Sequence, residues 1–152
     1  MGHRPDNMTN DDRQNRDRLA SLVEEERPRL AQMLGSTSFE IEERRGGHCS
    51  IAGSTLTLNI YRRPKSEVID SSIELHSLPS DPMKLSHQLH TWFILKSRGE
   101  PWPEPSTGTA RQLLGDELDR ASRALKVVAD KQMLLEALLW EAGYRNGWLA
   151  WG

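Results

Sequence analysis

The sequence has almost no cysteine and no long run of apolar residues. Cys49 is the single cysteine among 152 residues, so no disulfide can form within the chain, and such usage fits a reducing cytoplasm. No stretch approaches the roughly 18 consecutive apolar residues that a membrane-spanning helix requires. The first residues, MGHRPDNMTN, lack the apolar core of a secretory signal. We therefore expect a cytoplasmic protein without a membrane segment.

An excess of charge of either sign is also missing. The chain has 20 lysines and arginines against 22 aspartates and glutamates, for a net charge of −2. This balance disfavours wholesale disorder, because charge repulsion is what keeps disordered chains expanded. It also disfavours a dedicated nucleic-acid binder, because such proteins normally carry a strongly basic face. A length near ~150 residues is typical of one domain. We predict a disordered lead over residues 1–15 and a single α+β domain over residues 16–152.

Apolar periodicity predicts a helix first and strands after it. Helical spacing begins at Leu19 and ends at Gly35, with a kink near Arg27 and Pro28. Alternation of period two then predicts strands over residues 39–45, 48–51, 55–61 and 69–76. The short turns between them favour an antiparallel meander, because parallel pairing needs longer crossovers.

The third predicted strand has the clearest two-faced pattern. Leu56, Leu58 and Ile60 should face the helices, and Thr55, Thr57 and Tyr61 should face outward.

Two helices should follow the strands. The first is predicted over residues 81–99, with Asp81 as its N-cap. The second is predicted from Ala110 to Ala142, with heptad spacing from Leu114 to Leu139, and would be roughly 50 Å long at ~1.5 Å per residue; Gly115 is its expected early break. The predicted fold class is therefore α+β: an N-terminal helix, a three- to four-stranded antiparallel meander, then two helices, the last long, packed on one sheet face.

No catalytic or metal-binding motif is complete. His87 and His90 are three residues apart, but zinc needs at least one more ligand, so two surface histidines are the favoured interpretation. His48 and Cys49 look like a base beside a nucleophile, yet adjacent strand residues point to opposite faces, which favours Cys49 as a buried core residue. The glycines match no phosphate-binding pattern. We predict no metal and no cofactor.

Arginine and tryptophan are the residue types that indicate binding. Arginine pairs end two predicted strands, and if those ends are adjacent they form a basic rim for an acidic partner or a phosphate. Otherwise they are charged turns that keep sheet edges from pairing. The C-terminal tryptophans must dock within the chain or meet a partner. The candidate partner-binding residues are Arg44, Arg45, Arg62, Arg63, Trp140, Trp148 and Trp151.

The long C-terminal helix suggests association. A helix near ~50 Å would overhang strands of ~20 Å, and its end is apolar on more than one face, at Leu134 and Leu138 as well as Leu135 and Leu139. We expect a homodimer or a stable hetero-complex built on this helix and the tryptophan-rich tail.

Three hypotheses of function follow. The first is a non-catalytic protein-interaction module of a bacterial-type cytoplasmic protein, which binds a protein partner through the long helix, the tail or the arginine-rich strand ends. In architecture alone, its order of elements is similar to that of small bacterial toxin-immunity proteins and secretion chaperones. The alternative is a small enzyme with a site assembled from Arg44, His48, Tyr61, His87 and His90, which should converge in a concave apolar pocket. The third is a nucleic-acid-associated regulator that uses the arginines, against which the net charge counts.

Overall fold

A computed structural model describes residues 18–45, 47–62, 68–76, 88–101 and 107–145. The predicted lead over residues 1–15 lies outside these ranges. So do four of the candidate site residues, His87, Arg63, Trp148 and Trp151.

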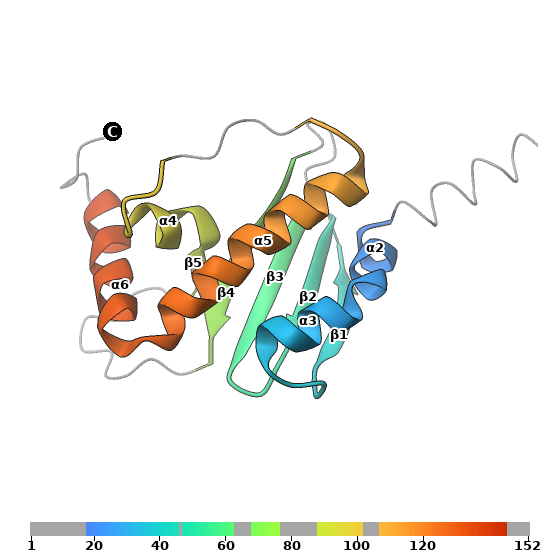
Figure 1. The fold of residues 1–152 in the computed structure, drawn as a ribbon, viewed down its shortest axis with the longest axis horizontal. Helices are drawn as coiled ribbons and strands as arrows, with labels where there is room; N and C mark the ends of the chain where they lie inside the picture. Colours follow the sequence, from blue (N-terminus) through green and yellow to red (C-terminus); the bar gives the residue numbers. More distant parts are fainter. Residues whose placement is uncertain (1–17, 46, 63–67, 77–87, 102–106, 146–152) are drawn as a thin grey trace, which may run out of the picture.

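Five strands form one antiparallel sheet in the order β1-β2-β3-β4-β5, with helices before and after it in the chain (Figure 1). The predicted α+β fold class is confirmed. The elements, in chain order, are α2 (Leu19–Glu25), α3 (Arg27–Leu34), β1 (Glu40–Arg44), β2 (His48–Ala52), β3 (Leu56–Arg62), β4 (Ile69–Leu75), β5 (Gln88–His90), α4 (Thr91–Lys96), α5 (Ala110–Ala129) and α6 (Lys131–Arg145). None of the helices in the described ranges combines the length and hydropathy needed to cross a bilayer.

The N-terminal helix is divided where the sequence predicts a kink. Helix α2 ends at Glu25 and α3 begins at Arg27, with Pro28 in its first turn, where the missing amide donor costs nothing. Gly35 ends α3 in the left-handed conformation, at φ 67°, as expected of a C-terminal glycine.

The helix predicted over residues 81–99 is confirmed over Thr91–Lys96, which forms α4, and is wrong over Gln88–His90. Gln88–His90 forms the fifth strand, β5, and pairs with Ser72–Glu74 of β4. Leu89 lies opposite Ile73 and both are fully buried, so the apolar position that suggested a helical stripe serves a strand instead. Helix α4 begins at Thr91, where the His90 imidazole accepts a hydrogen bond from the Trp92 amide.

The predicted continuous helix from Ala110 to Ala142 is interrupted at Asp130. Gly115 lies within α5 and does not break it; Asp130 is extended and its carboxylate accepts a 2.9 Å hydrogen bond from the Met133 amide. Asp130 therefore caps α6, which turns back against α4 and α5 and lies beside the sheet rather than continuing the line of α5 (Figure 1).

The register sorts the strand residues into two faces. On the inner face, one row crosses all five strands and consists of Ile41, Ile51, Leu58, Ile73 and Leu89. The last four belong to the core cluster that includes residues of α2, α4 and α5, and the partly buried Ile41 packs against it. Figure 1 shows α3 and α5 crossing in front of the strands, and none of the described helices lies behind them. Leu58 and Ile60 are fully buried and Leu56 is partly buried, so the predicted inward face of the third strand is correct.

Candidate binding face of the sheet

The outer face of the sheet is almost entirely polar. The alternation of strand side chains and the register place three rows on it. One row holds Arg44, His48, Tyr61 and Asp70; the middle row holds Glu42, Ser50, Asn59, Ser72 and His90; the third holds Glu40, Ala52, Thr57, Glu74 and Gln88.

The small polar residues of the middle row are covered by their larger neighbours. Ser50, Asn59 and Ser72 are each only 3% exposed, so their polar groups require partners. Ser50 Oγ and His48 Nε2 both donate to Asn59 Oδ1, at 2.9 and 2.8 Å, and Asn59 Nδ2 donates to Glu74 at 3.3 Å. Ser72 Oγ accepts a 2.6 Å bond from the Gln88 amide. These bonds tie β2, β3, β4 and β5 together beneath the surface.

Above this layer lie two stacked rings and a guanidinium. The His48 and Tyr61 rings stack with centroids 4.4 Å apart, and both residues are half-buried. The exposed Arg44 donates from Nε to Ser50 at 2.9 Å, and Gln88 donates to the Tyr61 hydroxyl at 2.7 Å. The sheet therefore brings three residues of the predicted enzyme site, Arg44, His48 and Tyr61, into one row.

His90, the fourth described residue of that predicted site, is in the middle row and lies close to Asp70 of the first row. Asp70 is opposite Tyr61 in the register and only 3% exposed, and its Oδ2 lies 3.8 Å from His90 Nε2. Because His90 Nδ1 accepts the Trp92 amide hydrogen at 3.2 Å, a neutral His90 carries its own proton on Nε2, toward Asp70.

The hydrogen bonds on this face do not activate a nucleophile. Ser50 Oγ lies 3.3 Å from His48 Nε2, the arrangement from which a serine–histidine pair is built. Asn59 Oδ1 can only accept, so His48 Nε2 must carry a hydrogen and has no lone pair to take the proton of Ser50. The Ser50 hydroxyl donates to the same Asn59 oxygen. The arrangement orders side chains without preparing a base.

The two strand ends that carry the arginines of the predicted basic rim lie next to each other. The amide of Arg62 donates to the carbonyl of Gly47 at 2.8 Å, so the turn after Arg44 and Arg45 lies against the end of β3. Arg44 also pairs with Glu42 at 3.5 Å, and both Arg44 and Arg45 are exposed. Arg62, which alternates with Tyr61, is on the opposite face of the sheet.

Trp140 is the candidate tryptophan that the structure describes. It lies on α6, away from the arginines at the end of β1. Its ring stacks on Tyr144 at 5.3 Å and contacts Phe93 of α4 at 5.7 Å. Helix α6 packs against α4 and α5, whereas Arg44 is on the edge strand β1, at the other side of the sheet. The predicted partner-binding residues are therefore divided between two regions.

The inner face holds a polar cluster that the sequence analysis missed. Glu117 of α5 is fully buried, accepts a 2.6 Å hydrogen bond from Ser71 and pairs with Arg120 at 2.9 Å. Ser71 also bonds Thr91 at 2.6 Å. Burial raises the pKa of the Glu117 carboxyl, against the lowering effect of Ser71 and Arg120. The sequence does hold two signals of this cluster: Ser71 lies on the apolar side of a strand, and Glu117 lies within the apolar stripe of a helix.

Cys49 is buried in the core, as expected, on the inner face opposite His48. Burial raises the pKa of its thiol to about 11, which leaves it protonated and unreactive near neutral pH. Within the ranges that the structure describes, no three histidine, cysteine, aspartate or glutamate side chains gather as metal ligands would.

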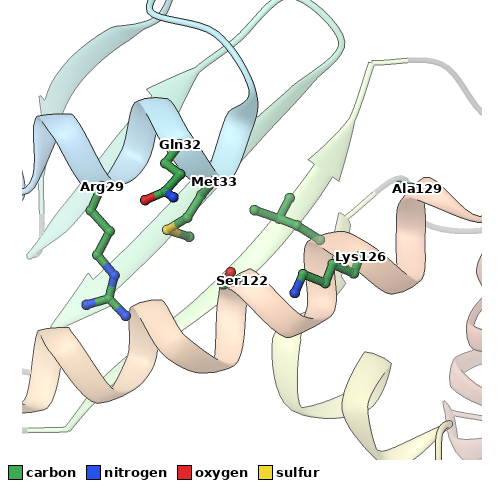
Figure 2. A pocket seen from close by; sticks show the side chains of 7 residues that line it. Arg29, Gln32, Met33, Ser122, Lys126 and Ala129 are labelled. Carbon is green, nitrogen blue, oxygen red and sulfur yellow. The ribbon is translucent and has the colours of Figure 1, made fainter.

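A groove lies elsewhere, between α3 and α5 (Figure 2). Its volume is about 460 Å³, and it is lined by Arg29, Gln32, Met33, Ser122, Leu125, Lys126 and Ala129. None of the four described residues of the predicted enzyme site lines it.

No protein-family model, curated protein or solved structure matches this chain.

Proposed function

We propose that this protein is a non-catalytic, cytoplasmic protein-binding module that contacts its partner with the outer face of its sheet. The observation that carries the proposal is the row of Arg44, His48 and Tyr61, held over a layer of hydrogen-bonded side chains. Arginine and tyrosine are among the residues that most often dominate binding energy at interfaces. Side chains that are already ordered lose less conformational entropy when a partner binds.

The charges of this face suggest how a partner is oriented. Arg44 lies at the end near the β1–β2 turn, and Glu40 and Glu74 lie on the row farthest from it. A partner with acidic side chains over Arg44 and basic side chains over the glutamates would match both ends. Such complementarity favours one orientation and speeds encounter.

The hydrogen bonding of this face disfavours the enzyme hypothesis. A general base needs a free lone pair directed at the proton it removes, and Asn59 occupies His48 Nε2. The groove between α3 and α5 is lined by other residues, and Arg44, His48, Tyr61 and His90 are not among them.

The proposal is tested by capture from the native host with the full chain as bait. The wild type should capture a protein partner that Arg44→Glu and Tyr61→Ala lose, and titration calorimetry with that purified partner should show affinity weakened at least about tenfold. The matched control is Lys131→Glu, which makes the same charge change at an exposed position of α6. Circular dichroism checks that each variant folds.

Two results would contradict the proposal. One is a partner whose affinity is the same for the wild type, Arg44→Glu and Tyr61→Ala. The other is salt-sensitive binding of DNA or RNA that Arg44→Glu abolishes, which would favour the nucleic-acid alternative.

A further inference from the structure

The groove between α3 and α5 lies where the facing side of α5 carries two short side chains, Ser122 and Ala129. Arg29, Gln32 and Met33 are spaced i, i+3, i+4 on α3, and Figure 2 shows Arg29 and Met33 extending from α3 toward α5. The facing positions on α5 are Ser122, Leu125, Lys126 and Ala129, spaced i, i+3, i+4, i+7, so they share one face of that helix. Ser122 and Ala129 are too small to fill the space between the helices.

Three of the seven residues that line the groove are apolar: Met33, Leu125 and Ala129. Met33 is half-buried, Leu125 is 7% exposed, and Ala129 is exposed at the end of α5. A methionine adapts its shape to different apolar neighbours. The volume of about 460 Å³ lies within the roughly 300–1,000 Å³ of ligand-binding clefts. An apolar side chain of a partner can therefore enter between the helices.

The rim of the groove is cationic. Two of its seven lining residues are basic and none is acidic, although acidic residues outnumber basic ones in the chain. Arg29 is held at one end by ion pairs with Asp119 and, at 3.7 Å, with Glu26. Lys126 is exposed and has no ion pair within the described part of the chain. The uncompensated positive charge is therefore at Lys126.

We propose that this groove is a second docking site, for an acidic amphipathic segment of a protein partner. An apolar side chain of that segment occupies the space among Met33, Leu125 and Ala129, and a neighbouring carboxylate pairs with Lys126. This is the recognition of an amphipathic helix in a groove, with charge complementarity setting the sign of the ligand. The groove lies on the helical side of the molecule, so the inference does not depend on the outer sheet face.

The experiment uses a fluorescein-labelled synthetic peptide in which leucines recur at helical spacing between glutamates. Fluorescence anisotropy with the full chain should show saturable binding. Lys126→Glu, which reverses the charge of the rim, and Ala129→Phe, which fills the groove at an exposed position, should each weaken it at least about tenfold. Lys131→Glu again controls for net charge, and Arg44→Glu controls for the sheet face; both should bind the peptide as the wild type does.

Four results would overturn this inference. The first is that the wild type shows no saturable binding of the peptide, and the second is that it binds a peptide with lysines in place of the glutamates equally well. The third is that both groove variants bind the peptide as the wild type does, and the fourth is that Lys131→Glu weakens binding as much as they do. If Arg44→Glu were the only variant to lose peptide binding, the peptide would bind at the sheet face and not in the groove. The proposed function is measured separately, with the captured partner, so either proposal can fail while the other stands.

Discussion

At the scale of single residues, Glu117 is the side chain least expected from its position. It lies fully buried in α5, where an isolated carboxylate would be very costly. Ser71 and Arg120 compensate part of that cost, yet burial remains the larger effect and raises the pKa of the carboxyl. Arg120 and His90 are the charged or titratable groups that act on it most strongly.

The raised pKa of Glu117 predicts a pH-dependent contribution to stability. The folded state holds this proton more tightly than the unfolded chain, so the contribution is full below the ordinary pKa of glutamate and is lost as the pH rises through the raised pKa. Glu117→Gln removes the titration. Relative to the wild type, its free energy of unfolding should therefore increase as the pH rises from about 4 to about 8.

Urea unfolding at several pH values measures this difference. The control is Glu40→Gln, which makes the same substitution at an exposed carboxyl on β1. A constant difference between Glu117→Gln and the wild type would show that Glu117 has the same pKa in both states.

At the scale of elements, the decisive feature is the interruption between α5 and α6. Heptad spacing continues across Asp130 in the sequence, which is why one long helix is predicted. In the structure, Asp130 is extended, Leu134 donates its amide to the Asp130 carbonyl at 2.8 Å, and the carboxylate caps the next turn through Met133. The two helices can then bury Leu134 and Leu138 within the chain.

Removing the Asp130 cap should destabilise the C-terminal helix. An aspartate or asparagine N-cap replaced by alanine typically costs about 1 kcal/mol, because the first amides of the helix lose an acceptor. We expect that loss in the free energy of unfolding of Asp130→Ala and little change in Asp130→Asn, measured by urea denaturation. If the two variants are equally stable, the carboxylate oxygen does not act as a cap.

At the scale of the whole molecule, the interruption removes the main argument for a homodimer. A helix of ~50 Å would overhang the sheet, but α6 packs on α4 and α5 instead. Among the described residues, Leu139 is the exposed large hydrophobic side chain, at 63%. Single apolar side chains on a surface are common and need no partner.

We therefore expect the isolated protein to be monomeric. Light scattering across a wide range of concentrations should give the mass of one chain throughout, and Leu139→Asp should not change it. A dimer mass that Leu139→Asp reduces to that of a monomer would restore association through the C-terminal helix.

The sequence alone determined the elements whose signals are local. Two-residue alternation identified β1 to β4 and the buried side of β3, and Pro28 and Gly35 marked the division and end of the first helices, because turn chemistry and side-chain period act within a few residues. The same reasoning could place Arg44, His48 and Tyr61 in strands, and it proposed them as members of one site.

Only the tertiary structure decided which side chains of those strands contact one another. The register sets His48 beside Asn59 and Tyr61, and this pairing orders the side chains of the candidate site. Ser71 and Glu117 are 46 residues apart in the chain, and Leu89 joins a strand because Ile73 is there to pair with it. Such contacts arise when the topology brings distant segments together, and no local pattern encodes them.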